Sequence, residues 1–438
     1  MPREKAFLKP ATAFGLFLAA LFLFRLFYGL TSDIWFIDQH QIYLIGLKFY
    51  CTHAWPYFGP DVGHYIQLPG ALQGLVVGLP LMLCPWPESP YVALAVLSFA
   101  GLGFFAWYAC RQLPDFPAWI VWGFTLSLPW SLNWSTNIDN DSYTLFGACL
   151  FFTAFLESLP ALALGLWPRP FGFYLMGFGL LWCAQFHMSY VLLFGFLAAA
   201  LLFQARAGLK ALAACGAGLA LGALTTGAFL IPTYLTYGWA SGSGGMAKAV
   251  ALNPENLKAF FTVAARFLSL ASFEIPRFIG ANSQERLGFL HQQAWLWPFA
   301  LVLFAAWIAQ VLAMLVMGFQ SRPGDRRWQA VRILAGATFL GIYLSFLFAI
   351  KAPAAHTYYL TLPLALFYAF YCLKPWAGRA WFKPLAGCLM ACNLAFHLGV
   401  GLAHYSTKSL YVNRPFFEKA IAARDYHLFG ERRDGTRY

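Results

Sequence analysis

Charged residues are scarce in this sequence: Asp, Glu, Lys and Arg make up 11% of the 438 residues, whereas 60% are apolar. So little charge cannot cover the surface of a water-soluble domain of this length. The alternating segments of roughly ten residues that build a membrane β-barrel are also missing, and no internal repeat of about 20 to 50 residues is visible. These absences exclude a soluble fold, a β-barrel and a repeat array, and they leave helices that cross a membrane.

The sequence also lacks a cysteine pattern. Its nine cysteines are scattered through apolar segments, only Cys51 lies in a polar loop, and no CxxC spacing occurs, so we predict neither a disulfide framework nor a cysteine metal site. The net charge of +12 does not indicate nucleic-acid binding, because the basic residues stand singly in short connections between apolar runs. That placement is typical of the cytoplasmic loops of membrane proteins, and we predict no nucleic-acid partner.

Apolar runs of about 20 residues, the length that crosses a ~30 Å hydrocarbon core as a helix, follow one another along the chain. We therefore predict an all-α, polytopic transmembrane helical bundle of about eleven spans. The first run is too long for a signal-peptide core and is interpreted as a retained span with a cytoplasmic start. The predicted spans are 9–30, 90–110, 117–134, 143–163, 171–187, 188–205, 210–235, 294–318, 330–350, 357–374 and 384–404.

A shorter apolar segment at 68–84 is predicted to be re-entrant or interfacial. Counting it as a span would move the basic connections outside, against the positive-inside rule. Under this topology residues 1–404 form the membrane core, with external loops at 31–67 and 236–293. Residues 405–438 form a short external tail that carries an interfacial helix.

Acidic residues gather in two of the predicted external segments. Asp33 and Asp38 follow the first span, and Asn137, Asp139 and Asp141 stand at the head of a later span. A single acid at such a place is commonly a solvated loop residue. An Asp-x-Asp arrangement, however, can put two carboxylates on one cation, and hard oxygen ligands suit Mg²⁺ or Mn²⁺. Together the two clusters predict a polar site on the external face, with Asp139 and Asp141 as candidate metal ligands.

These motifs resemble the GT-C superfamily of membrane glycosyltransferases, which includes protein mannosyltransferases, aminoarabinose transferases and oligosaccharyltransferases. Members carry an acidic residue soon after the first span, then a juxtamembrane helix and a Pro-Tyr stretch. Asp38, the segment 39–50 and the Pro-Tyr pair at 56–57 hold those positions here. The acidic motif at 137–141 is similar to the second-loop motif of the superfamily, and the His-Thr-Tyr-Tyr turn at 356–359 is similar to a late segment of bacterial members.

The sequence departs from the family pattern at three places. Asp-Gln at 38–39 stands where the aminoarabinose and mannosyl branches have Asp-Glu, no large soluble domain follows the last predicted span, and the WWD motif of oligosaccharyltransferases is missing. The last departure disfavours transfer to a peptide. Metal dependence differs between branches, so the use of a divalent cation stays open.

The resemblance implies a glycosyltransferase that moves a sugar from a polyprenyl-phosphate-linked donor to an unidentified acceptor on the periplasmic face of the inner membrane. Such a reaction needs a base for the acceptor and positive groups for the leaving phosphate. We predict Asp38 as the base, at the mouth of a groove where burial would raise its pKa. Asp33, Asn137, Asp139 and Asp141 would position the sugar or a cation.

Residues that carry positive charge or donate hydrogen bonds are the candidates for binding the phosphate. Each also has a simpler interpretation: a lysine that snorkels at a span end, an aromatic belt around the His-Tyr-Tyr turn, or a solvated amphipathic face in the loop 236–293. The candidates are Lys351, His356, Tyr358, Arg277 and Arg286.

Gln185, His187 and Ser189 interrupt an otherwise continuous apolar run. Polar groups at membrane depth face a cavity or a partner helix, so Gln185 and His187 are predicted to line a polar cavity beside the acidic site. Hydrogen bonds between helices would also account for them. Asn393 and His397 are predicted to be structural.

A transporter or flippase for a lipid-linked or small polar substrate is the alternative function. Such proteins usually show inverted repeats and charges near the bilayer midplane, whereas the acids here cluster at one predicted surface and no repeat is visible. A polysaccharide polymerase or ligase with a large external loop is a third candidate.

Overall fold

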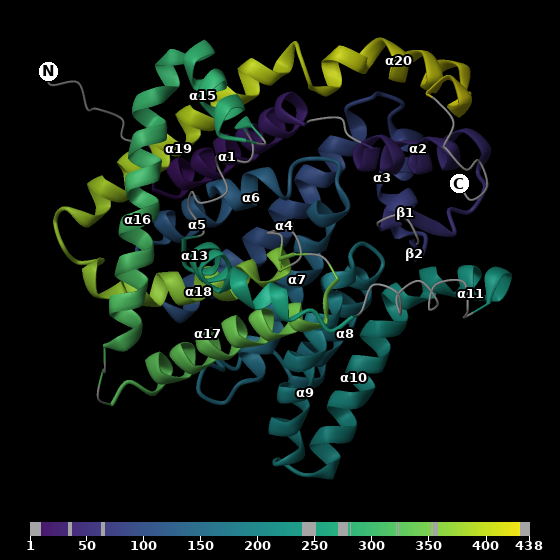
Figure 1. Ribbon diagram of the computed structural model, residues 1–438. Coiled ribbons are helices and arrows are strands. Elements are labelled where there is room, and N and C mark those ends of the chain that lie inside the picture. The colour runs from purple at the N-terminus through teal and green to yellow at the C-terminus, as the bar shows by residue number, and fades with distance from the viewer. Residues whose placement is uncertain are drawn as a thin grey trace, which may run out of the picture.

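The computed structural model describes most of the chain as helix, with one short β-hairpin (Figure 1). The described residues are 10–33, 37–62, 66–238, 251–269, 279–280, 282–320, 322, 324–350, 352–353 and 358–429. Two antiparallel strands form the hairpin, in which Asp61 pairs with Gln67 across the strands. The strands are β1 (Phe58–Val62) and β2 (Ile66–Pro69).

Helices fill the remainder of the described chain. The first half contains α1 (Pro10–Ser32), α2 (Ile37–Thr52), α3 (Leu72–Leu83), α4 (Ser89–Gln112), α5 (Ala118–Ser127), α6 (Pro129–Asn133), α7 (Asn140–Ser158), α8 (Arg169–Ala184), the 3-10 helix η1 (Met188–Tyr190), α9 (Val191–Ala205), α10 (Leu209–Gly227) and α11 (Ile231–Tyr237). The second half contains η3 (Pro254–Ala259), α13 (Phe260–Ser269), α15 (Ser283–Gln292), α16 (Trp297–Phe319), α17 (Arg326–Ser345), η7 (Tyr359–Thr361), α18 (Leu362–Leu373), α19 (Phe382–Tyr405), α20 (Leu410–Ala423) and η9 (Tyr426–Phe429).

Every predicted span contains a helix, and the protein is an integral membrane protein. In the described part of the chain, 7 helices are long and apolar enough to cross a bilayer. The other predicted spans form shorter or more polar helices, namely α5 with α6, α7, α8 and α18. The segment predicted to be re-entrant forms α3, whose 12 residues reach only about 18 Å at 1.5 Å per residue. That length is too short for a full crossing.

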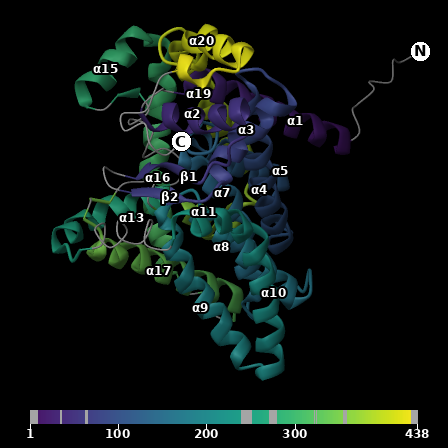
Figure 2. The ribbon, with the colours of Figure 1, turned by 90° about the vertical axis from the view of Figure 1, so that its right-hand side faces the viewer.

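The helices differ in how far they are enclosed. In α18 all residues except Leu373 are buried, so this helix lies in the centre of the bundle. In α16 only Leu303, Met314 and Met317 are buried, although nearly all of its residues are apolar. A membrane-spanning helix with such an exposed apolar surface faces lipid. The connected ends of α9 and α10 project away from the rest of the molecule in both views (Figures 1 and 2), whereas further along α10 packs closely against α8 at Gly222.

The break between α5 and α6 is set by Pro129. A residue before proline favours an extended backbone, and Leu128 has φ −56° and ψ 147°. Pro129 then occupies the first turn of α6, where its missing N–H is not needed. The break leaves the last carbonyls of α5 without their helical donors. Inside a membrane such carbonyls require other partners.

Arg25 supplies donors at this break. It lies within α1, its side chain is 1% exposed, and its guanidinium donates to the carbonyls of Leu126 (2.7 Å) and Ser131 (3.1 Å). It also donates to the hydroxyls of Ser98 (3.0 Å) and Ser135 (2.6 Å). One buried arginine therefore joins α1, α4 and the irregular segment that follows α5. The sequence analysis did not identify this residue.

The C-terminal tail folds back over α2. The predicted helix in this tail is present as α20, and it lies at the end of the molecule near α2 and α3 in both views (Figure 2). Phe417 of α20 is 1% exposed, and its ring centroid lies 4.5 Å from that of Tyr43 in α2. Arg414 donates to Glu88 at 2.6 Å, just before α4. These contacts hold α2 against the bundle.

We expect Arg25→Met to lower the unfolding temperature of the detergent-solubilised protein. The carbonyl of Leu126 would lose the donor that Arg25 supplies, whereas that of Ser131 would keep the hydroxyl of Ser135. A buried acceptor left without a donor costs about 1–3 kcal/mol. Arg379→Met, at an exposed position, is the matched control and should unfold like the parent protein. Equal unfolding temperatures for both variants would show that Arg25 does not stabilise the break.

Candidate active site

The two acidic segments of the sequence meet in the structure. The carboxylate of Asp33, directly after α1, accepts hydrogen bonds from the backbone N–H of Ile138 (2.9 Å) and the hydroxyl of Tyr91 (2.7 Å). Six residues further along, the amide of Gln39 donates to the carboxylate of Asp139 at 3.1 Å. The segment that begins at Asp33 after α1 and runs into α2 therefore contacts the segment before α7 at two points.

Asp33 is a buried anchor rather than a residue at the surface of the site. Its side chain is 0% exposed, and its donors come from α4 and from the segment that leads into α7. A buried carboxylate requires such donors because water cannot reach it. The arrangement fixes where the first acidic segment leaves α1, and with it the start of α2.

Asp38 lies in the first turn of α2 and is exposed. The predicted burial of this carboxylate is therefore wrong. Successive residues of a helix are rotated by about 100°, and α2 turns Gln39, not Asp38, toward Asp139. Asp38 is consequently at the rim of the site, where a carboxylate in a first helical turn is also favoured by the helix dipole.

Asp141 and His187 form a buried pair. Asp141 is in the first turn of α7, and its Oδ1 lies 3.3 Å from Nε2 of His187, with side chains 6% and 10% exposed. The other ring nitrogen of His187 accepts from the backbone N–H of Ser189 at 3.1 Å. The polar break in the apolar run thus brings His187 to the second acidic segment, beside the site.

Asp139 and Asp141 have partners on different elements, Gln39 of α2 and His187 of the α8–α9 break. Asn137 between these segments is half-buried, and its carbonyl accepts from the backbone N–H of Asp139 at 2.8 Å. A divalent cation needs several oxygens that converge on one point. Among the residues that the structure describes, no group of three or more His, Cys, Asp or Glu side chains could hold a metal ion.

Gln185 joins helices. Its amide donates to the carbonyls of Leu181 (3.1 Å) in α8 and Thr226 (2.9 Å) in α10. Its side chain also packs against Gly70, which has a φ of +121° and where a Cβ would lie 2.5 Å from the Gln185 oxygen. The simpler interpretation, a hydrogen bond between helices, accounts for Gln185, and only glycine fits at position 70.

Of the residues predicted to bind the phosphate, the structure describes Tyr358, which is buried among aromatic rings, and Arg286, which bonds to a carbonyl close to it in the sequence. Tyr358 is 0% exposed, and its ring centroid lies 5.9 Å from those of Trp130 and Phe346. Arg286 donates through Nε to the nearby carbonyl of Gly280 at 2.8 Å. Three further candidates, Lys351, His356 and Arg277, lie outside the described residues.

The structure adds polar groups that the sequence analysis missed. Gln41 donates to the carboxylate of Asp61 at 2.9 Å, and the backbone N–H of Asp61 donates back to the Gln41 side chain at 2.8 Å. Asp38 and Gln41 are three residues apart and therefore neighbours on α2. In the sequence, Gln39 and Gln41 stand out as two polar amides in a segment that is otherwise largely apolar, and this contrast could have marked them as site residues. Nothing in the sequence indicated that the β-hairpin would bring Asp61 into contact with Gln41.

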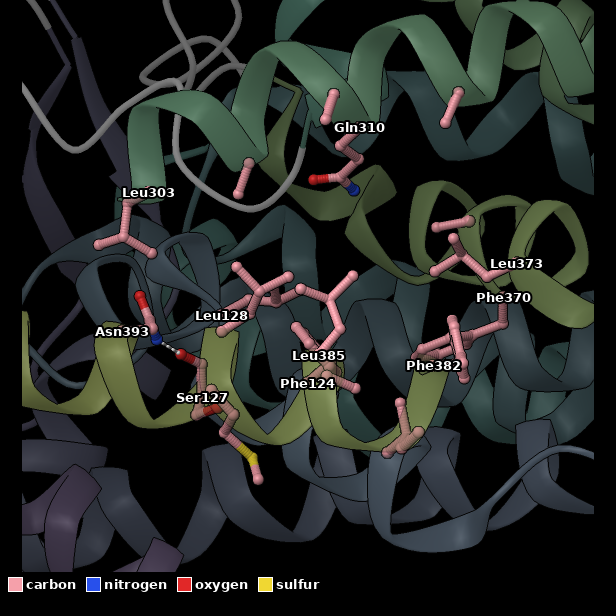
Figure 3. A pocket seen from close by; sticks show the side chains of 18 of the residues that line it. Phe124, Ser127, Leu128, Leu303, Gln310, Phe370, Leu373, Phe382, Leu385 and Asn393 are labelled. Atoms are coloured by element: carbon pink, nitrogen blue, oxygen red, sulfur yellow. Dashed lines mark hydrogen bonds between the residues drawn. The ribbon is translucent and has the colours of Figure 1, made fainter. Parts of the chain in front are cut away.

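An apolar groove of about 500 Å³ lies between α5, α16, α18 and α19 (Figure 3). Its polar side chains are Gln310, Ser127 and Asn393, and the amide of Asn393 donates to the carbonyl of Ser127. Asn393 is therefore structural, as predicted, because it satisfies another carbonyl at the α5–α6 break. Pro129 also lines the groove, and α6 spans about 8 Å from there toward the second acidic segment.

Comparison with known proteins supports the fold. No protein-family model and no curated protein matches the chain. Two solved structures of ArnT from Cupriavidus metallidurans, one in the apo state and one bound to undecaprenyl phosphate, match with a TM-score of 0.51 at 13% and 16% identity. The matches cover 96% of this chain and 78% and 76% of the ArnT chains. The fold of this chain is thus similar to that of ArnT, as the predicted resemblance implies.

We expect Asp33→Ala to lower the unfolding temperature more than Asp33→Asn. The asparagine oxygen can still accept from Tyr91 and Ile138, whereas alanine leaves two buried donors without an acceptor. Thermal unfolding of the two purified variants, followed by tryptophan fluorescence, measures the difference. Equal losses for the two variants, each of which removes the charge, would mean that the charge and not the hydrogen bonds holds the segments together.

Proposed function

We propose that this protein is a glycosyltransferase that moves a sugar from a polyprenyl-phosphate-linked donor to an acceptor at the periplasmic face of the inner membrane. The observation that carries the proposal is the contact between the two acidic segments. Gln39 bonds to Asp139, and this contact gathers the carboxylates of two separate segments at one place in a fold similar to ArnT. A shared site of this kind is what transfer between two substrates needs.

The choice of donor rests on the comparison and on the groove. One of the similar ArnT structures is bound to undecaprenyl phosphate. In this chain the apolar groove offers an isoprenoid chain a lining of leucine, phenylalanine and alanine side chains, and burial of such a chain is favourable at about 25 cal/mol per Å². With the isoprenoid chain in the groove, the phosphate and sugar of the donor would lie along α6, which leads from Pro129 to the second acidic segment.

The chemistry assigns Asp38 the role of base. An exposed carboxylate at the rim can take the proton from an acceptor hydroxyl or amine as that atom bonds to the anomeric carbon. The bond from this carbon to the phosphate oxygen breaks at the same time, and the lipid phosphate leaves with the electron pair. Attack from the face opposite the phosphate inverts the anomeric centre. Asp139, held by Gln39, and Asp61, held by Gln41, are positioned to accept hydrogen bonds from sugar hydroxyls.

The leaving phosphate needs positive or donating groups near the site. Lys351, His356 and Arg277 remain the candidates, together with Arg286. Asp141 would orient the sugar from the side of α7, supported by His187.

We expect Asp38→Asn to insert and fold normally but to lose at least about 100-fold in transfer rate, the usual contribution of a general base. Radiolabelled sugar transfer from a panel of undecaprenyl-phosphate-linked sugars into membranes measures the rate. Asp115→Asn is the matched control. Asp115 is also exposed, but it follows the C-terminal end of α4, whereas Tyr91, which contacts Asp33, lies at the N-terminal end of that helix. Normal turnover by Asp38→Asn would remove the base assignment. Movement of the lipid-linked sugar across vesicles without any transfer would favour the flippase alternative.

Because Asp139 and Asp141 have separate partners, we expect transfer to persist when EDTA removes divalent cations. The same radiolabel assay, run on one membrane preparation with and without EDTA, provides the measurement. Activity that disappears with EDTA and returns on addition of Mg²⁺ or Mn²⁺ would show instead that the acidic pair holds a cation.

A further inference from the structure

His187 lies in the break between α8 and α9 and contacts two elements at once. Its backbone is extended, with φ −153° and ψ 141°, and it forms the N-cap of η1. Ring Nδ1 accepts from the backbone N–H of Ser189 at 3.1 Å and lies 2.8 Å from the hydroxyl of the same residue. Ring Nε2 lies 3.3 Å from the carboxylate of Asp141. One imidazole therefore bridges the helix break and the first turn of α7.

The backbone N–H of Ser189 favours one position for the ring proton of His187. A backbone N–H can only donate, so Nδ1 must present its lone pair. In a neutral imidazole the proton is then on Nε2, the nitrogen that faces Asp141. A proton on Nδ1 could be donated to the Ser189 hydroxyl, 2.8 Å away, but it would break the bond from the Ser189 N–H and would leave Nε2 as a lone pair opposite a carboxylate. Both contacts therefore favour the same tautomer.

Because the pair is buried, the tautomer of His187 affects how strongly its ring interacts with Asp141. The side chains of His187 and Asp141 are 10% and 6% exposed, so bulk water is a poor substitute for either contact. A donor in such surroundings interacts more strongly with a carboxylate than it would in water. The distance of 3.3 Å is slightly longer than a standard N–H···O bond, and contacts of this kind commonly tighten when substrate binds.

We propose that His187 is a positioning residue that holds the Asp141 carboxylate through its Nε2–H and does not act as a base. A proton on Nδ1 would break the bond from the backbone N–H of Ser189. The importance of Asp141 for sugar transfer rests on the proposed function, whereas the tautomer rests on the geometry alone. In this proposal, the break between α8 and α9 places His187 where it can orient the carboxylate of Asp141 on α7.

Two substitutions separate this role from that of a helix cap. In His187→Asn the side-chain oxygen can take the place of Nδ1 and accept from Ser189, but the side chain is too short to reach Asp141. In His187→Gln the amide can place an N–H where Nε2–H lies, but the contact with Ser189 is lost. Each variant therefore keeps one contact and removes the other.

We expect the two variants to rank in opposite orders in two measurements. The unfolding temperature should be higher for His187→Asn, which keeps the cap. The transfer rate should be higher for His187→Gln, by roughly 10- to 100-fold, because a misplaced carboxylate slows a reaction by that order. A purely structural histidine would give the same order in both measurements, and that result would overturn the proposal.

A measurement of the tautomer needs no substrate. Protein labelled with ¹⁵N at its nine histidines and embedded in bilayers gives the ring nitrogen signals, and the His187 signals are those missing from the His187→Gln spectrum. We expect an unprotonated Nδ1 and a protonated Nε2 at neutral pH. A protonated Nδ1, whether in the other tautomer or in an imidazolium, would overturn the proposal.

The two kinds of measurement also separate this inference from the proposed function. If the predicted tautomer and the predicted order of stability are found but no sugar transfer is detected in the parent protein, then the proposed function fails and the geometry of His187 stands. If transfer is found and requires Asp38 but the tautomer is wrong, only the role of His187 fails.

Discussion

A buried carboxylate needs donors, and Asp33 finds them on two different elements, the hydroxyl of Tyr91 in α4 and the backbone N–H of Ile138 before α7. Because the side chain is fully buried, neither donor can be exchanged for water without opening the bundle. This requirement fixes the end of α1 against the start of α7, and the first turn of α2 follows only a few residues later. The bond between Gln39 and Asp139 then closes the same junction from the other side. The candidate site depends on this junction, because it is what brings the carboxylates of two distant segments together.

The α5–α6 break is a second place where buried polar groups need partners from other helices. A helix that breaks inside a membrane exposes carbonyls that lipid cannot satisfy, and here Arg25 and Asn393 donate to the carbonyls of Leu126 and Ser127. The break ends at the apolar groove on one side and leads through α6 toward the acidic segment on the other. The same irregular backbone therefore connects a surface suited to a lipid chain with a surface suited to a sugar. Breaks at functional sites of membrane proteins are tolerated where protein groups replace the missing helical bonds.

The acids of the site divide into two kinds. Asp33 and Asp141 are buried and held by partners on other helices, whereas Asp38 is exposed at the start of α2. Asp33 anchors the junction, whereas the carboxylate of Asp141, held beside the site by His187, is fixed in an orientation that suits the positioning of a substrate. An exposed carboxylate can meet an acceptor that arrives from water and release its proton afterwards. The division gives the residues of one acidic cluster different parts in the proposed reaction.

The sequence by itself determined that this protein is a helical membrane protein and where most helices lie, because the length and apolarity of a segment decide whether it can cross a bilayer. The positions of the basic connections also indicated that the segment 68–84 is not a span, and the 12-residue length of α3 agrees. It also identified the acidic segments and the polar break at His187, because polar groups are rare at such places. Only the tertiary structure decided which acids are buried, that Gln39 rather than Asp38 meets Asp139, that Asp61 returns to Gln41 on a β-hairpin, and that Arg25 holds the α5–α6 break. These features depend on which faces of separate helices come together. Nearly continuous apolarity leaves no periodicity from which those faces can be read.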